Sequence, residues 1–293
     1  MILVAGATGF LGREICRRLG EQGQPVRGLA RASSDATIVA ELAAMGMDIV
    51  RGDLRDRSSL DAACRGVTTL ISTVTTTRSR QPGDSIEATD RQGQLDLVDA
   101  ARRAGVRRLI FVSFSDQIGG DDALTAAKRS VERRISETGI TSTIVRPSFF
   151  MEVWLSPALG FDHPNGSVTV YGSGERKVSW ISLADVARFI VRALDDPRTE
   201  GATIELGGPE ALSPLEVVRI FEDAAGRPFT VHHVPEEALR AQRDSAADSM
   251  SQAFASLMLS AAAGDEIPMQ DTLRTFGLRF TSVRDYARAV VAS

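Results

Sequence analysis

The stretch Gly6-Ala-Thr-Gly9-Phe-Leu-Gly12 follows directly on an apolar run at residues 2–5 and leads into a helical pattern at about residues 11–22. We expect Gly6 to permit a tight turn out of a strand, Gly9 to let the backbone approach a phosphate, and Gly12 to let the helix pack closely on a sheet. The N–H groups at a helix N-terminus attract anions. This order of strand, glycine loop and helix predicts a dinucleotide-binding unit, against the alternative of a turn that merely needs glycine.

The first half of the chain continues the same alternation of short apolar runs and longer helical patterns. Near-continuous apolar strands separated by helices indicate a parallel sheet that is covered on both faces. With right-handed crossovers, this order predicts a doubly wound Rossmann α/β fold. The expected strands are Val26–Arg31, Asp48–Val50, Leu70–Val74, Leu109–Val112 and Ser142–Val145, and the expected helices are Thr37–Met45, Ser58–Ala63, Ser85–Ala104 and Asp122–Thr138.

The second half is less regular. Prolines and glycines interrupt residues 149–180, whereas Ser182–Asp195 has a helical pattern and Thr203–Leu206 resembles a late strand. A further helix is expected at Ala246–Ala263. We therefore expect a dinucleotide-binding domain over residues 1–150, to which residues 181–207 return, and a smaller C-terminal α/β cap made of residues 151–180 and 208–293.

Composition excludes several classes of protein. The 293 residues carry a formal net charge of −4, from 34 basic and 38 acidic residues, so binding to nucleic-acid phosphates is not expected. Two cysteines, Cys16 and Cys64, and three histidines form no metal-ligand spacing, so neither a metal site nor a disulfide framework is expected. Because no signal peptide and no membrane-spanning run is found, we expect a cytoplasmic protein without a membrane partner.

The end of the second predicted strand selects the coenzyme. Proteins that bind NAD place an acid there, about 20 residues after the glycine loop, for the ribose 2′-hydroxyl group. Here Arg31 occupies that end, followed by Ser33, and residues 29–34 contain no acid. Because a guanidinium group can bind a 2′-phosphate with two hydrogen bonds, NADP(H) is favoured over NAD(H). The alternative is that Arg31 is a solvated surface charge.

Two residues after the third strand are candidates for the adenine subsite. Asp53 can accept a hydrogen bond from the adenine amino group, and Leu54 can pack on the ring. The alternative for Asp53, about equally favoured, is that its carboxylate caps a turn.

Motifs along nearly the whole chain resemble the short-chain dehydrogenase/reductase superfamily in its extended and atypical branches, and most closely the NmrA-like NAD(P)H-binding reductases. The matching segments are the glycine stretch, Gly52-Asp53-Leu54, Asp90-Arg-Gln-Gly93, Leu109-Ile-Phe-Val-Ser113, Lys128, Arg146-Pro147-Ser148-Phe149-Phe150-Met151 and Thr281-Ser-Val-Arg-Asp-Tyr286. The resemblance implies that the loop residues Thr8, Phe10 and Leu11 contact the coenzyme together with the three glycines.

The resemblance also implies an active site, and the chain departs from it. The family's usual catalytic residues are a Ser and a Tyr-x-x-x-Lys motif, in which the Tyr transfers the proton. Ser113 and Lys128 match, but Leu124 stands where the Tyr is expected and cannot transfer a proton. Lys128 then acts directly as acid or base, as in isoflavone-reductase-like relatives, or only hydrogen-bonds the ribose. Tyr171, in the predicted cap loop, is an alternative proton donor.

Other residues should border the reacting ring. Coenzymes of this fold lie across the C-terminal strand ends, so Thr73 and Val74 should border the ribose and nicotinamide, and Pro147 and Phe149 the nicotinamide face. The residues Phe150, Met151 and Trp154, with Phe149, would form an apolar wall for a flat substrate. The alternative for this aromatic group is core packing.

We therefore predict an NADPH-dependent oxidoreductase that transfers a hydride to a small conjugated or aromatic substrate, such as a quinone, an enone or a ketone. The main alternative is a non-catalytic NADP(H)-sensing regulatory protein, which the absent Tyr favours. A sugar-nucleotide epimerase is a third possibility, and Leu124 argues against it. The helices expected at residues 85–104 and 121–138 are candidates for pairing in a homodimer.

Overall fold

The computed structural model describes residues 1–77 and 81–292 of the chain. Contacts between Cα atoms divide the chain into two compact units, and each is described here by itself. The first unit comprises Met1–Ser113, Ala123–Val145 and Ala187–Ile204, and the second comprises Phe114–Asp122, Arg146–Val186 and Glu205–Ser293.

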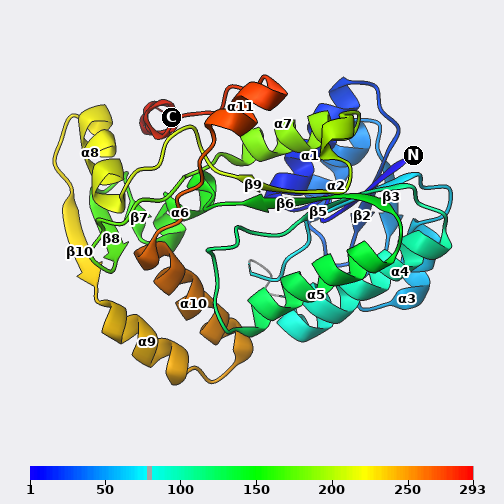
Figure 1. Ribbon diagram of the computed structural model, residues 1–293, viewed down its shortest axis with the longest axis horizontal. Helices are drawn as coiled ribbons and strands as arrows, with labels where there is room; N and C mark the ends of the chain where they lie inside the picture. The colour runs from blue at the N-terminus through cyan, green and yellow to red at the C-terminus, as the bar shows by residue number, and fades with distance from the viewer. Residues whose placement is uncertain (78–80, 293) are drawn as a thin grey trace. The chain divides into compact units, whose positions relative to one another are not determined.

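A seven-stranded sheet in the order β3-β2-β1-β4-β5-β6-β9 is the main feature of the fold (Figure 1). Its strands are β1 (Ile2–Ala5), β2 (Val26–Ala30), β3 (Asp48–Arg51), β4 (Thr69–Ser72), β5 (Arg108–Val112), β6 (Thr141–Pro147) and β9 (Ala202–Leu206). Neighbouring strands from β3 to β6 pair in parallel, and β1 lies between β2 and β4. The direction of the strand order reverses there, which is where doubly wound folds bind ligands. The predicted fold class is confirmed.

Helices cover both faces of this sheet. Helices α3, α4 and α5 lie on one face, and α1 lies on the other (Figure 1). The first face buries an apolar cluster that includes Leu60, Leu97 and Val131 of the helices and Leu70 and Phe111 of the strands. The helices of this part are α1 (Phe10–Glu21), α2 (Ala36–Ala44), α3 (Arg57–Ala63), α4 (Gln94–Arg103), α5 (Ala123–Glu137) and α7 (Leu183–Ala193), with a short 3₁₀ turn η3 (Pro197–Thr199).

The helix expected over residues 85–104 is not one regular helix. A π-helix, η1 (Ile86–Gly93), precedes α4, and the Ser85 hydroxyl group caps it by accepting a hydrogen bond from Ala88 N. The wider π turn allows the buried Asp90 carboxylate to accept from both the backbone N–H and the hydroxyl group of Thr76. Apolar periodicity does not reveal such a turn, and π-helical segments are frequent at functional sites.

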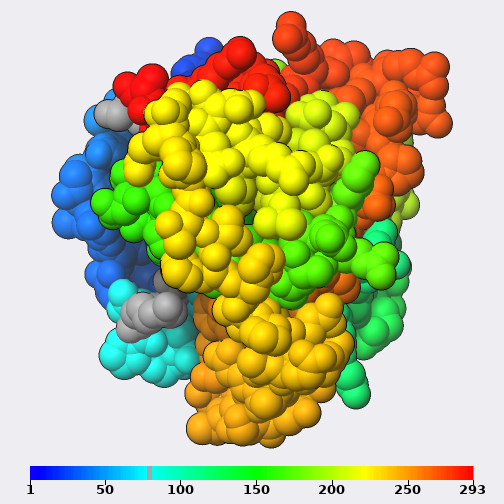
Figure 2. Space-filling view, turned by 90° about the vertical axis from the view of Figure 1, so that its left-hand side faces the viewer, coloured from blue at the N-terminus to red at the C-terminus, as the bar shows by residue number. Residues whose placement is uncertain are grey.

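The second unit has a three-stranded sheet in the order β10-β8-β7. Strand β8 (Ser167–Tyr171) pairs in parallel with β10 (Thr230–Val234) and antiparallel with β7 (Phe161–Asp162). The other elements are α6 (Met151–Trp154), η2 (Pro157–Leu159), α8 (Pro214–Ala225), α9 (Glu236–Asp244), α10 (Ser249–Ala263), α11 (Gln270–Phe276) and α12 (Val283–Val291). On one face of this unit, α8, β10 and α9 form a continuous surface, coloured yellow to orange (Figure 2).

Capping sets several helix boundaries in the second unit. Ser213 and Glu216 form a reciprocal capping box at the start of α8. Helix α10 begins at Ser249, three residues later than the expected helix at 246–263, because Asp248 is its N-cap and accepts from Ser251 N.

Among the described residues, no helix is both long enough and apolar enough to cross a lipid bilayer.

Candidate functional site

The glycine loop connects β1 to α1 with very little free space. Gly6 has φ +85°, and a Cβ atom built there would lie 2.6 Å from Thr73 Oγ1. A Cβ atom at Gly12 would lie 2.0 Å from the Gly6 carbonyl oxygen. Gly9 is the N-cap of α1, so no side chain caps the helix, and its first turn contains no acidic residue. The backbone therefore forms a cradle with a positive helix end, which fits a pyrophosphate group.

The end of β2 carries the predicted phosphate-binding arginine. The Arg31 backbone N–H donates to Ser34 Oγ, and its guanidinium group donates to Asp84 Oδ2 at 2.7 Å. Ser33 is exposed in the same turn. The Arg31 side chain is 32% exposed, so part of it is shielded from solvent by its neighbours.

Asp53, at the predicted adenine subsite, is held by Arg55. The Arg55 Nε and Nη2 atoms donate to the two oxygens of Asp53 at 2.9 and 2.7 Å. These hydrogen bonds lower the pKa of the Asp53 carboxyl group below its ordinary value, so it remains an acceptor. Leu54 is buried in the apolar cluster of the first unit, which leaves little of its side chain for contact with a ring.

Lys128, on α5, is the buried amine of the first unit. Only 4% of the residue is exposed, and its Nζ atom donates to the carbonyl oxygens of Val74 at 3.2 Å and Val112 at 3.5 Å. The amine also lies 5.2 Å from the centre of the Phe111 ring. Burial lowers the pKa of Lys128, while the charge of Asp90 opposes this effect. A buried lysine loses its proton more readily than a solvated one, although carbonyl oxygens that accept from the ammonium group favour its charged form.

The structure also shows the two other positions of the active site that the resemblance implies. Leu124 is 2% exposed and occupies the first turn of α5, four residues before Lys128. Ser113 follows β5, and its hydroxyl group accepts from Arg129 Nη1 at 3.3 Å. Within residues 1–77 and 81–292, Lys128 and Ser113 form no hydrogen bond with each other. The structure thus places both residues in the first unit without joining them directly.

Further polar residues surround Lys128 that were not predicted from the sequence. Gln94 Nε2 donates to the Val74 carbonyl oxygen that also accepts from Lys128, and Gln94 Oε1 accepts from Ser72. Thr73, predicted to border the ribose, donates its hydroxyl group to the carbonyl oxygen of Ala5. Buried polar side chains on an otherwise apolar helix face were the available signal, because such groups must find partners.

In the second unit, most of the predicted apolar wall is packed into the interior. Phe149 and Met151 are buried, and the Phe149 ring lies 4.7 Å from the Trp154 ring in an edge-to-face arrangement. Pro147 is also buried, at the end of β6, whereas Phe150 is only partly buried. The core-packing interpretation therefore describes Phe149 and Met151 in this structure.

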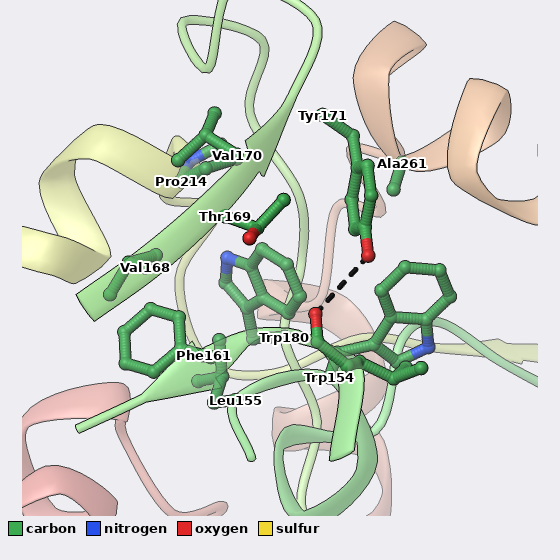
Figure 3. Close-up of a pocket in the computed structure, with 11 residues that line it drawn as sticks. Trp154, Leu155, Phe161, Val168, Thr169, Val170, Tyr171, Trp180, Pro214 and Ala261 are labelled. Atoms are coloured by element: carbon green, nitrogen blue, oxygen red, sulfur yellow. Dashed lines mark hydrogen bonds between the residues drawn. The ribbon is translucent and has the colours of Figure 1, made fainter. Parts of the chain in front are cut away.

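Trp154 and Tyr171 line a small cavity in the second unit, where they lie with Trp180 around the same space (Figure 3). The cavity has a volume of about 30 Å³, which holds one or two water molecules and not an aromatic ring. The Tyr171 hydroxyl group donates to the Leu159 carbonyl oxygen at 3.2 Å, and burial raises the pKa of this phenol. Tyr171 thus keeps its proton at neutral pH.

A buried carboxyl group also lies in the second unit. Asp265 is 1% exposed, and Ser115 donates to its Oδ1 atom at 2.7 Å. The Asp265 Oδ2 atom and the nearby Ser148 hydroxyl group are buried without a hydrogen-bond partner. Burial raises the pKa of Asp265 above its ordinary value, although the hydrogen bond from Ser115 opposes this effect.

Comparison with known proteins gives consistent matches. A model of the NmrA-like family matches residues 1–285. An NAD(P)H azoreductase of Xenophilus azovorans is 34% identical over 265 residues, which cover 87% of this chain and 86% of that protein. The (4-alkanoyl-5-oxo-2,5-dihydrofuran-3-yl)methyl phosphate reductase of Streptomyces griseus subsp. griseus is 33% identical over 242 residues, which cover 82% of this chain and 79% of that protein.

Solved structures share the fold. The structure of an NADPH-dependent quinone oxidoreductase of Escherichia coli, in complex with NADPH, matches with a TM-score of 0.79 and 20% identity and covers 99% of both chains. These matches confirm the resemblance and the fold that the sequence predicts.

Proposed function

Since this chain belongs to the NmrA-like family, we propose that it is an NADPH-dependent reductase that transfers a hydride to a small conjugated or aromatic acceptor. The observation that carries the proposal is the combination, within one unit, of the uncapped glycine cradle and the buried amine of Lys128. Two relatives that are more than 30% identical are named as reductases, one of them as NAD(P)H-dependent, which supports the same activity here.

The residues of the first unit fit a phosphorylated dinucleotide. The N–H groups of Phe10, Leu11 and Gly12 would hold the pyrophosphate, because the Gly9 N–H already donates to the Gly6 carbonyl oxygen. Arg31 would bind the 2′-phosphate, and Thr73 and Val74 would border the ribose. When bound, the coenzyme supplies the hydride. On this proposal residues 1–150 and 181–207 form the dinucleotide-binding domain, and residues 151–180 and 208–293 form the cap.

Lys128 would move the proton at its Nζ atom. Because burial lowers its pKa, the amine exchanges a proton near neutral pH more readily than a solvated lysine does. The carbonyl groups of Val74 and Val112 orient the amine and accept its hydrogen bonds in the charged state. Ser113, kept in place by Arg129, would hold a water molecule for the same step.

The substrate would contact Phe150, Met151, Trp154 and Tyr171, whereas Pro147 and Phe149 would border the nicotinamide face. The apolar, aromatic character of these residues supports a flat acceptor over a charged one. The cavity beside Trp154 must widen before it accepts a ring, since its present volume is about 30 Å³.

One observation favours the second candidate, a non-catalytic NADP(H)-sensing protein. The first turn of α5 buries Leu124 where a proton-transferring phenol is expected, so proton transfer depends on Lys128 alone or on a group of the second unit.

Two buried free thiols, Cys16 and Cys64, support a reducing cytoplasm as the location. Pairing of α4 and α5 across a two-fold axis remains a prediction.

The test is NADPH oxidation with a panel of quinones, enones and aromatic ketones. We expect turnover by the wild-type protein, and a kcat at least about 100-fold lower in Lys128→Met, the range of general acid–base catalysis. The matched control Lys177→Met, at an exposed lysine of the second unit, should keep the wild-type kcat. NADPH binding without turnover of any acceptor would establish the sensor instead, and a normal kcat in Lys128→Met would remove the amine from proton transfer.

A further inference from the structure

Two arginines and two aspartates form a compact group beside the end of β2. Arg31 Nη1 donates to Asp84 Oδ2 at 2.7 Å, and Arg55 makes two hydrogen bonds to Asp53. Arg55 Nη1 also lies 3.7 Å from Asp84 Oδ1, so the Asp84 carboxylate bridges the two guanidinium groups. We name Arg31, Arg55, Asp53 and Asp84 the arginine–aspartate quartet. Its formal charges sum to zero.

The backbone around Asp84 fixes this carboxylate. The side chain of Asp84 is only 5% exposed, compared with 32% for Arg31 and 33% for Arg55. Asp84 N donates to the Gln81 carbonyl oxygen, and the next residue is Ser85, the N-cap of η1. The Thr89 hydroxyl group lies 3.5 Å from Asp84 Oδ1. The Asp84 carboxylate is therefore fixed beside Arg31 by the surrounding backbone and does not rotate freely at the surface.

We propose that Asp84 sets the coenzyme selectivity of this protein by placing a buried negative charge beside the guanidinium group that binds the 2′-phosphate. The inference rests on the proposed function, because Arg31 is the phosphate-binding residue there. A 2′-phosphate carries a charge of about −1.5 to −2 at neutral pH, so the Asp84 carboxylate repels it while the Arg31 guanidinium group attracts it. A ribose 2′-hydroxyl group carries no charge and is not repelled.

This arrangement has a direct consequence for coenzyme use. Arg31 attracts the phosphate while Asp84 repels it, so the advantage of NADPH over NADH is smaller than a lone arginine would produce. The protein therefore binds both coenzymes, with a modest preference for NADPH. Asp53 contributes less to this effect, because its two oxygens accept from Arg55, whereas Asp84 accepts directly from Arg31.

The test compares the Kd values of NADPH and NADH by titration calorimetry for the wild-type protein and Asp84→Asn. The asparagine side chain keeps an oxygen that accepts from Arg31 but removes the charge. We expect the Kd of NADPH to fall about tenfold, as for one charge removed at short range near a protein surface. The Kd of NADH should stay the same, and added salt should reduce the difference between the two proteins.

Two further variants separate the possible outcomes. Asp61→Asn, on α3, removes a charge from an exposed ion pair with Arg103 of α4 and should leave both Kd values unchanged. Arg31→Gln should weaken NADPH binding and spare NADH. If Arg31→Gln has no effect on the ratio, the phosphate assignment of the proposed function is wrong. If Arg31→Gln lowers the NADPH preference but Asp84→Asn leaves it unchanged or lowers it as well, the selectivity role of Asp84 is overturned while the proposed function stands.

Discussion

Helix α1 contains two glycines that differ in what surrounds them, and replacing each by alanine isolates the role of the loop. At Gly12, the new Cβ atom would lie 2.0 Å from the Gly6 carbonyl oxygen and 2.7 Å from its carbon. At Gly20, in the same helix, the nearest atoms are the flexible Met47 Cε at 3.1 Å and the Met45 carbonyl oxygen at 3.7 Å. The chemical change is identical, but the new methyl group meets the backbone of the glycine loop at Gly12 and a flexible methionine side chain at Gly20.

The magnitudes follow from these distances. A Cβ atom approaches a backbone oxygen no closer than about 3 Å, so Gly12→Ala must push the loop and helix apart by about 1 Å. Overpacking of this kind costs about 1–3 kcal/mol, partly offset by about 1 kcal/mol of gained helix propensity. The displaced N–H groups no longer reach the pyrophosphate, and one lost charge-assisted hydrogen bond weakens NADPH binding roughly 10- to 100-fold. Gly20→Ala should instead stabilise the protein by about 0.5–1 kcal/mol.

Thermal unfolding and NADPH titration of the two variants measure these effects. Gly12→Ala should unfold at a lower temperature than Gly20→Ala and should bind NADPH more weakly than the wild-type protein. Gly20→Ala should bind NADPH as the wild-type protein does. An unchanged Kd for NADPH in a folded Gly12→Ala variant would refute the role of this loop in coenzyme binding.

Two further predictions concern buried charges. Arg108 donates to Thr143 Oγ1, Thr199 Oγ1 and the Ala193 carbonyl oxygen. Arg108→Met should therefore lower the free energy of unfolding by about 3 kcal/mol in denaturant titrations, without changing the Kd of NADPH. A stability loss well below that would mean that water replaces the guanidinium group. Because burial raises the pKa of Asp265, the folded protein retains this proton to higher pH than the unfolded chain, and stability falls as the pH rises from the unfolded pKa through the folded one. Asp265→Asn should therefore raise Tm at neutral pH, by an amount that shrinks in acid, and a lower Tm at neutral pH would contradict this sign.

The fold could be predicted because its decisive constraints are local. Gly6 adopts a positive φ, and Gly12 lies too close to the loop for a side chain, so each position requires glycine. The glycine spacing in the sequence therefore indicates both features. Apolar strands that alternate with helices then leave few possible topologies. The reductase class was implied by the resemblance to the NmrA-like family, and the names of the relatives bear it out.

The polar environment of the site could not be predicted in the same way. Asp84 is separated from Arg31 by more than fifty residues, and nothing in either local sequence indicates that they pair. Apolar periodicity in the segment before Gln94 predicts a regular helix, whereas the π turn there depends on the partner that Asp90 finds in Thr76. Long-range pairing of side chains depends on tertiary packing, which periodicity and propensity do not encode.

The charge state of Lys128 follows from this long-range packing and not from its own motif. Its amine is surrounded by two carbonyl groups and a ring, and the Asp90 carboxylate acts on it only through space, because that carboxylate is bonded to Thr76. If Asp90 paired directly with the amine, it would hold the proton on Lys128 and raise its pKa. By binding Asp90, Thr76 leaves burial as the dominant influence on Lys128. We therefore expect the pKa of Lys128 to depend on whether the Asp90 carboxylate already has a hydrogen-bond partner.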